Sequence, residues 1–312
     1  MTNKTKRHLL TLYTRTPLHL GSGTSVDVVD LPIMRERITG FPVIPSTSLK
    51  GVLRQEARDF AASDTGKAKG FTLAIADSLF GAKDDVQKDE KDNPLLHAGC
   101  VQITEAKLLA FPVRSLAGCF AWLTCPVALR RFERDTSLHV PIPAKLDAEH
   151  VIAGSDLVVA GCNEVVLEEY ALNPQPGAAL NAASETAKGL HSLTKDSLWQ
   201  EELSKRLAIV HDENFQYFVT SCTEVVARIV INPETRTNEN LFNQENVPCE
   251  ALFYSVLQVL PARKPGAYGD IHQHLTNLLA EARVIQIGGD ETTGHGLCET
   301  VHQPLNDNQE AK

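Results

Sequence analysis

Residues 17–54 read PLHLGSGTSVDVVDLPIMRERITGFPVIPSTSLKGVLR, and this stretch decides the fold. Before it, residues 7–16 alternate bulky and polar side chains, which is the period of a strand. Within it, Pro42 and Pro45 bracket a short extended piece. An amphipathic helix is predicted over 47–62, and the hydroxyls of the Ser-Thr-Ser triplet at its start are suited to cap the first turn. This order of strand, loop and helix favours an α+β protein.

More strands and helices follow, separated by polar loops. Predicted are a strand pair over 99–112, a strand and a helix start over 118–129, β-rich structure over 146–170, a helix over 198–207, strands over 218–232 and 248–260 joined by a polar hairpin, a helix over 271–283 and a last strand over 284–287. Residues 83–93 and 173–189 are predicted loops. The pattern predicts an α+β sheet with helices on one face, and a ferredoxin-like core interrupted by a long insertion.

The composition is that of an ordinary globular protein. With 312 residues, 43% of them hydrophobic and 22% charged, the chain fits one large domain or two smaller ones. No run of roughly eighteen apolar residues predicts a transmembrane span, and the N-terminus lacks the apolar core of a signal peptide. Seven scattered cysteines without a CxxC pair argue against a zinc ribbon and indicate reduced, mostly buried thiols in a cytoplasmic protein.

The net charge of −9 counts against a protein that binds nucleic acid by itself, because phosphate contacts need a basic face. Arg and Lys nevertheless cluster at 35–58 and 114–134, while acidic residues concentrate at 83–92. This distribution is compatible with a basic groove on an otherwise acidic protein.

Two glycine-rich tracts lie at opposite ends of the chain. In the first, Gly21-Ser22-Gly23, backbone N–H groups can converge on an anion, but a plain tight turn after a strand explains the same residues. The second, residues 288–296 (GGDETTGHG), is the stronger signal, because so many glycines are costly in chain entropy unless close backbone approach is required. Neither tract has Walker or dinucleotide-binding spacing, so the sequence argues against an ATPase or a dehydrogenase.

Charged side chains between these tracts suggest phosphate chemistry. Lys50 and Arg54 lie one turn apart near the start of the predicted helix, where the helix dipole also favours an anion, although a solvated helix face is the alternative. Asp27 and Asp30 lie in a loop, where a carboxylate can hold a divalent metal or act on a 2′-hydroxyl, or can be a solvated turn residue. His19 is a candidate acid or base with a structural alternative. The remaining histidines show no zinc-ligand pattern.

Four segments spread over most of the chain carry a family resemblance. They read HLGSG…VVDLPIMRERITGFPVIPSTSLKGVLR, HAGCVQITEAKLLAFPVRSLAGCFAWLTCP, RIVINPETRT and VIQIGGDETTGHG. In sequence and in order they resemble the backbone subunit of the type III-B CRISPR effector, the Cmr complex, in the RAMP superfamily. The SxxSLKGxxR helix and the terminal glycine loop are shared with more distant RAMP proteins, whereas the other segments resemble this subunit in particular.

The resemblance implies a single RAMP domain over 1–312 with a modified ferredoxin-like (RRM-like) palm, inserted segments and a β-hairpin thumb. The insertions would cover about 83–95 and 135–215, and the candidate thumb hairpin is 231–247. Such subunits stack into a helical filament along a guide RNA, beside other Cmr subunits. Each thumb displaces a nucleotide of the guide–target duplex at regular intervals, and an acidic loop residue cuts the target RNA there with a divalent metal, Mg²⁺ or Mn²⁺.

The resemblance also assigns roles to residues. The VVD-x-PI motif places the catalytic and metal-holding aspartate at Asp30, with His19, Glu245 and Asp27 as further candidates. The candidate RNA-binding residues are Gly21, Ser22, Gly23, Ser46, Ser48, Lys50, Arg54, Arg114, Ser115, Gly288, Gly289, Thr292, Gly294, His295 and Gly296. The chain departs from the family pattern where the helix opens Ser-Thr-Ser in place of Gly-Ser-Ser, and where His295 replaces a frequent Lys or Arg.

The expected activity is cleavage of target RNA, with the sequence read by base pairing and the phosphodiester attacked in line by a 2′-hydroxyl. Asp30 would take a proton or position the metal. The alternatives are a guide-RNA scaffold without catalysis, a ribonuclease that processes precursor guide RNA alone and without metal, and a small-molecule enzyme, for which the sequence has no cofactor motif.

Overall fold

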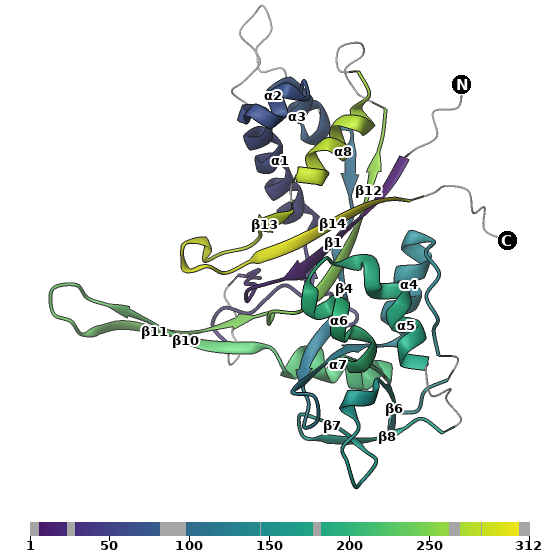
Figure 1. Cartoon of the computed structure of the whole chain (residues 1–312). Coiled ribbons are helices and arrows are strands. Elements are labelled where there is room, and N and C mark those ends of the chain that lie inside the picture. The colour runs from purple at the N-terminus through teal and green to yellow at the C-terminus, as the bar shows by residue number, and fades with distance from the viewer. Residues whose placement is uncertain are drawn as a thin grey trace, which may run out of the picture.

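The palm is an antiparallel sheet built around the first strand of the chain (Figure 1). β1 (Lys6–Thr14) lies between β14 (Leu297–Leu305) and β12 (Leu252–Val259), and β4 (Ala106–Arg114) lies beyond β12. Counted along the chain, these four strands have the spatial order 4-1-3-2, with a helix after the first and another before the last. That arrangement is ferredoxin-like, so the predicted α+β fold class is confirmed. This computed structural model describes residues 6–23, 29–81, 98–143, 145–176, 182–261, 269–281 and 283–305.

Two helices cover one face of the palm, where the side chains of Leu10 and Leu12 point. α1 (Ser46–Ala62) presents a buried stripe at helical spacing, and α8 (Ile271–Glu281) packs beside it. The predicted helix is therefore confirmed, but its cap is not. Pro45 occupies the N-cap position, and no side chain of the described residues caps the first turn.

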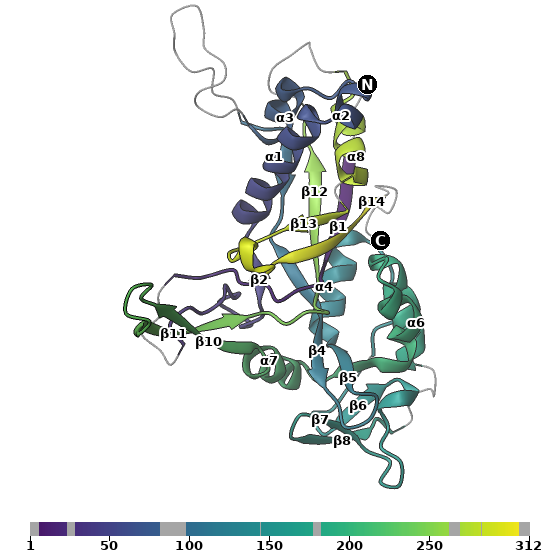
Figure 2. The same cartoon turned by 60° about the vertical axis from the view of Figure 1, so that its left-hand side comes forward.

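The opposite face of the sheet is also covered, so helices lie on both faces (Figure 2). Here Leu9 and Tyr13 pack against α4 (Pro126–Thr136), α5 (Ala182–Leu190) and α6 (Ser197–Arg206). All three helices belong to the middle of the chain. The expectation of helices on one face holds for the palm alone, because the insertion folds back over its other side.

The insertion extends the palm sheet. Beyond β4 follow β5 (Phe120–Thr124), β9 (Leu207–Val210), β6 (His150–Ala153), β8 (Tyr170–Pro174) and β7 (Val165–Leu167). The β-rich prediction for 146–170 is confirmed, whereas the predicted loop over 173–189 is wrong because α5 occupies its second half. The remaining short elements are β2 (Val43–Ile44), α2 (Asp64–Ala68), α3 (Leu73–Phe80), β3 (Val101–Ile103), η1 (Ser155–Leu157), η2 (His191–Leu193), α7 (Asp212–Ser221), β13 (Val284–Gln286) and η3 (Glu291–Thr293).

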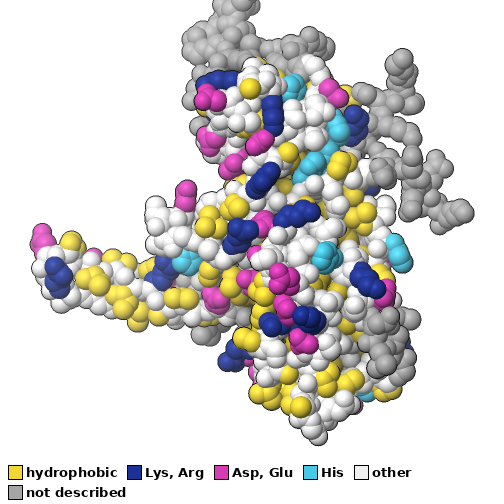
Figure 3. Space-filling model, viewed as in Figure 1, with side chains coloured by type: hydrophobic (Ala, Val, Ile, Leu, Met, Phe, Trp, Pro, Cys, Tyr) yellow, Lys and Arg dark blue, Asp and Glu magenta, His cyan; other side chains and the backbone are white. Residues whose placement is uncertain are grey.

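A two-stranded hairpin projects from the body as a thumb (Figure 1). It consists of β10 (Glu224–Ile231) and β11 (Asn238–Asn246), paired from Glu224 with Asn246 outward. The predicted thumb, 231–247, thus holds only the turn and the second strand, and the predicted strand over 218–232 begins inside α7. The polar sequence of β11 does not resemble a strand, and it becomes one by pairing with β10. Apolar side chains line the projecting hairpin (Figure 3).

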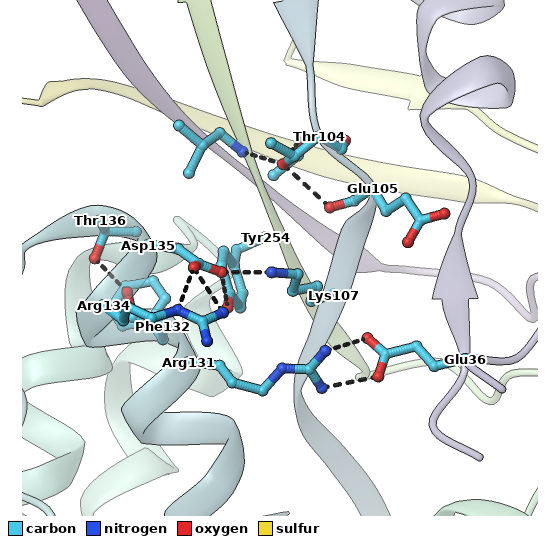
Figure 4. Close-up of polar contacts among 12 residues, drawn as sticks. Glu36, Thr104, Glu105, Lys107, Arg131, Phe132, Arg134, Asp135, Thr136 and Tyr254 are labelled. Carbon is cyan, nitrogen blue, oxygen red and sulfur yellow. Dashed lines mark hydrogen bonds and ion pairs between the residues drawn. The ribbon is translucent and has the colours of Figure 1, made fainter. Parts of the chain in front are cut away.

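Ion pairs fasten α4 to the palm and to the basic loop that follows Asp30 (Figure 4). Arg131 donates two hydrogen bonds, of 2.8 and 2.9 Å, to the carboxylate of Glu36. One turn further, Asp135 accepts from Lys107 at 2.6 Å and from Tyr254 at 3.0 Å. Burial alone would raise the pKa of Asp135, but hydrogen bonds from Lys107, Arg134 and Tyr254 outweigh it and lower the pKa. The loop before α1 is therefore held against α4.

The predicted loop at 83–93 and insertion at 83–95 lie outside the described residues.

Candidate functional site

The acidic loop folds back on the first glycine turn. The backbone N–H of Ser22 donates to the carbonyl of Pro32 at 2.9 Å, and that of Met34 to Leu20 at 2.7 Å. Gly21 forms a β-bridge with Ile33 between them. Asp30 lies on the returning arm of this loop with its side chain exposed. Asp27, the second candidate of the loop, lies outside the described residues.

Asp30 touches the root of the thumb. Its Oδ2 accepts a hydrogen bond of 2.8 Å from the backbone N–H of Asn243 in β11. The next residue, Leu31, exchanges backbone hydrogen bonds with Asn243 and Glu245, each of 3.0 Å. The acidic loop thus runs beside β11 as a short added strand, which fixes an exposed carboxylate where the hairpin leaves the palm.

Glu245 lies next to Asp30 in space, but its environment is different. Its side chain is 6% exposed. One carboxylate oxygen accepts from the backbone N–H of Ile33 at 3.0 Å, and the other from Thr223 at 2.8 Å and from Arg35. A buried carboxylate with three donors is a structural anchor for the acidic loop.

His19 lies where the two glycine tracts meet. Its Nδ1 donates to the carbonyl of Glu245 at 2.7 Å, because a carbonyl oxygen can only accept. A Cβ on Gly21 would lie 3.0 Å from Nε2 of the same ring. From the other tract, the backbone N–H of Gly289 donates to the carbonyl of His19 at 3.0 Å. The two glycine tracts, which lie at opposite ends of the sequence, therefore meet in the fold.

Two glycines of the terminal loop are required by backbone contact. A Cβ on Gly288 would lie 2.2 Å from the His19 carbonyl oxygen, and one on Gly296 would lie 2.0 Å from that of Ile287. Both residues also have positive φ angles, +86° and +77°. Thr292 and Gly294 are exposed on the loop. The first contact presses the loop against the segment that follows β1, the second closes the base of the loop, and the tip stays open.

Side chains tie the terminal loop to the thumb. The carboxylate of Asp290 accepts from Arg228 at 3.0 Å and from Gln244 at 2.5 Å. His295 lies 3.4 Å from the same Arg228 guanidinium and 3.1 Å from the hydroxyl of Thr293. Gln244 follows Asn243, the residue that holds Asp30, so one network joins the acidic loop, the hairpin and the glycine loop.

The start of α1, which carries Lys50 and the other predicted RNA-binding residues of the helix, lies beside β13 and the terminal loop (Figures 1 and 2). Ser46 and Ser48 are in its first turn, whose N–H groups have no side-chain cap among the described residues. Lys50 is half-buried on the next turn. Arg54 instead donates to the carbonyl of Phe80 at 2.8 Å, which satisfies the last turn of α3.

Arg114 and Ser115 belong to a different surface. Arg114 forms an ion pair with Glu168, and the hydroxyl of Ser115, which is 8% exposed, donates to the carbonyl of Val166 at 3.3 Å. Arg114 and Glu168 border a cleft of about 620 Å³ between the insertion and the thumb root. These contacts occupy both side chains in holding the insertion.

The acidic loop offers a single described carboxylate to a metal. Within the described residues, no three His, Cys, Asp or Glu side chains come together as a metal cluster. The chemistry of Asp30 still fits Mg²⁺ or Mn²⁺, because Mg²⁺ often binds through one or two carboxylates together with substrate phosphates and water. An ion at Asp30 would therefore depend on RNA for further ligands.

The palm, the paired glycine loops and the projecting hairpin define a class of ferredoxin-like proteins with an added thumb. The chain belongs to the RAMP superfamily, whose family model matches residues 11–299. It is 36% identical to the CRISPR system Cmr endoribonuclease Cmr4 of Pyrococcus furiosus, over 97% of this chain and 98% of that protein.

Solved structures agree with this assignment. The crystal structure of oligomeric Cmr4 from Pyrococcus furiosus matches with a TM-score of 0.70 and 29% identity, over 97% of this chain and 99% of that one. A chain of a type III-B Cmr-beta complex bound to cognate target RNA also has a TM-score of 0.70, at 19% identity, over 95% of this chain and 96% of that one. The latter likeness shows the shared fold. No helix in the described part of the chain is long and apolar enough to cross a membrane.

Proposed function

We propose that this chain is a guide-RNA-binding filament subunit of a type III-B CRISPR interference complex and that it cleaves complementary target RNA at regular intervals. The observation that carries the proposal is the exposed carboxylate of Asp30, held at the thumb root by the amide of Asn243. The likeness to a protein named a Cmr endoribonuclease supports the same activity.

The guide strand lies against the converging glycine tracts and the start of α1. Backbone N–H groups of the first helical turn hold phosphates, and Lys50 adds a positive charge. None of these groups reads a base. Sequence is therefore read by pairing between guide and target, while the protein holds the backbone.

The thumb determines where the target is cut. As a narrow hairpin with apolar side chains such as Ile229 and Leu241 exposed, it separates neighbouring base pairs and leaves one target nucleotide out of the stack. Because Asp30 is bonded to the thumb root, each copy places its acid beside the nucleotide that its own thumb displaces. Copies stacked along the guide then cut at a fixed spacing.

Cleavage is an in-line attack by the displaced ribose. The 2′-oxygen forms a bond to the adjacent phosphorus and loses its proton. The bond to the 5′-oxygen breaks, and that oxygen takes a proton from water, so the products are a 2′,3′-cyclic phosphate and a 5′-hydroxyl. Asp30 either accepts that proton or holds a divalent ion, Mg²⁺ or Mn²⁺. A bound ion would neutralise charge on the phosphate in the transition state.

The proposed partners are guide RNA, target RNA, further copies of this chain and other Cmr subunits, in the cytoplasm. All seven cysteines are unpaired, as a reducing compartment would leave them. Three are buried and two are exposed, so the expected set of mostly buried thiols is only partly present.

The test is the Asp30→Asn variant in the reconstituted complex. Loss of the acid is expected to slow target cleavage by at least about 100-fold while guide and target binding stay within about twofold. Asp64→Asn, a fully exposed aspartate of α2, is the matched control and is expected to cut normally. Normal cutting by Asp30→Asn would instead make the chain a scaffold.

A second experiment separates the metal and processing alternatives. The proposal predicts that EDTA stops target cutting and that Mg²⁺ or Mn²⁺ restores it. Cleavage of precursor guide RNA by the isolated chain in EDTA would support the stand-alone processing ribonuclease.

A further inference from the structure

A basic cleft, separate from every predicted site, lies on the palm. It has a volume of about 660 Å³ and is bordered by three cationic side chains, Arg15, Lys195 and Arg283. These come from the end of β1, the segment before α6 and the segment after α8. Basic side chains are visible over β13 and β14 in Figure 3.

The positive charge of this cleft is only partly neutralised within the described part of the chain. Lys195 and Arg283 are exposed and form no ion pair there. Arg15 pairs with Glu299, which is 6% exposed and also accepts from the hydroxyl of Thr194 and the backbone N–H of Lys195, at 2.7 and 2.6 Å. Glu281, close to Arg283 in sequence, is paired with Lys69 at 2.5 Å.

An anion bound in this cleft would be attracted by both Lys195 and Arg283. Their neighbourhood is partly apolar: Val284 is 44% exposed and, with Leu279 and Val301, borders the same cleft. Cations around an open groove with apolar walls are typical of sites for single-stranded nucleic acid, where phosphates meet the charges and riboses or bases meet the walls.

The cleft adjoins the root of the terminal glycine loop. The backbone N–H of Arg15 donates to the carbonyl of Leu297 at 2.8 Å, and Gly296 donates to Pro17 at 2.8 Å. On its other side, Arg283 directly precedes β13, which leads into the same loop. Residues 288–296 of the loop include His295 and no Lys or Arg, so these basic side chains add positive charge beside it.

We propose that this cleft binds backbone phosphates of the guide RNA and continues the track that begins at the glycine tracts. The proposal rests on the proposed function, since it extends the same RNA surface. Lys195 and Arg283 each contact one phosphate, and Arg15 stays bonded to Glu299 as the wall of the groove.

The experiment measures the affinity of the full chain for single-stranded guide RNA at several salt concentrations. Each lost phosphate contact lowers the slope of log K against log salt by about 0.7. The double variant Lys195→Gln/Arg283→Gln is therefore expected to lower the slope by about 1.4 and to weaken binding about tenfold or more at low salt. Lys188→Gln/Lys205→Gln, on α5 and α6, is the charge-matched control and is expected to keep the wild-type slope.

A second measurement is independent of the variants. Bound RNA should protect Lys195 of the wild-type chain from amine acetylation and leave Lys188 reactive. If the wild-type chain binds RNA but the double variant keeps the wild-type slope, or Lys195 is not protected, the cleft is not an RNA site. The proposed function is unaffected by either result. If the double variant keeps the wild-type slope but fails to form filaments without RNA, the cleft is a contact between copies, and that result also overturns the proposal. Absence of RNA binding by the wild type would defeat both proposals.

Discussion

The backbone N–H of Asn243 donates a 2.8 Å hydrogen bond to the carboxylate of Asp30, which joins the acidic loop to the thumb. An amide donor to one oxygen fixes the direction of the carboxylate and leaves the side chain in solvent. Because a two-stranded ribbon is only marginally stable alone, the thumb depends on such contacts at its root. The position of the acid and the position of the thumb are therefore set together.

Glu245 is expected to support the site without taking part in the chemistry. Glu245→Ala removes the acceptor of Ile33 and leaves Arg35 without its partner, which should cost about 3–5 kcal/mol of unfolding free energy. Glu245→Gln keeps an acceptor for Ile33 and should cost less. Thermal unfolding and single-turnover cleavage of both variants check this. A Glu245→Gln variant that folds normally but cuts as poorly as Asp30→Asn would make Glu245 a second catalytic acid.

Adjacent glycines of the terminal loop should respond differently to the same substitution. Gly288→Ala puts a Cβ 2.2 Å from the carbonyl oxygen of His19 in a left-handed conformation, so the two tracts must move apart. The backbone strain alone costs about 1–3 kcal/mol, and guide-RNA affinity should fall at least about tenfold. Gly289→Ala is the matched control, because its Cβ comes no closer than 3.8 Å to the His19 ring. Equal affinities for the two variants would contradict the role given to this contact.

The stability of the palm should fall in mild acid because of a histidine cluster. His8 is fully buried, its Nδ1 lies 2.6 Å from Nε2 of His302, and the ring of His272 is 4.6 Å away. Burial, then the charges of His302, His272 and Lys6, lower the pKa of His8 to about 3, and burial and His272 lower that of His302 to about 4.

A pKa lowered by folding means that the unfolded chain takes up the proton first. The contribution of these histidines to the free energy of unfolding is therefore fully present above their unfolded pKa of about 6.5. It is lost as pH falls towards their pKa values in the folded protein. Between pH 6.5 and 4.5, His8→Gln should lose about 2–3 kcal/mol less than the wild type in denaturant unfolding, at about 1.4 kcal/mol per pH unit. His139→Gln, an exposed histidine, is the control. Parallel pH profiles for His8→Gln and the wild type would contradict the prediction.

Local pattern was sufficient to predict part of the palm. The alternation before Pro17 and the apolar stripe of α1 are each contained in one short segment. β14 was missed because its strand residues include Pro304 and several polar side chains, and because its partner β1 lies at the other end of the chain. The local pattern gave β11 only as a polar connection, and the family resemblance placed a β-hairpin there; its strand conformation comes from pairing with β10.

The site shows the same division. His19 and the glycine tracts stand out by residue type, whereas Asp30 is separated from Asp27 by the family motif alone. Asn243 could not be predicted, because it acts through a backbone amide that nearly every residue possesses. Arg228 and Gln244 reach Asp290 only through the register of the thumb, which the sequence does not specify.

The most direct test of the account maps the cuts in one complementary target by complexes that mix wild-type and Asp30→Asn subunits. If each copy cuts beside its own thumb, the product ladder keeps its spacing and every cut weakens in proportion to the fraction of variant subunits. A full ladder from complexes that contain only the variant, or a spacing that changes with the mixture, would contradict it.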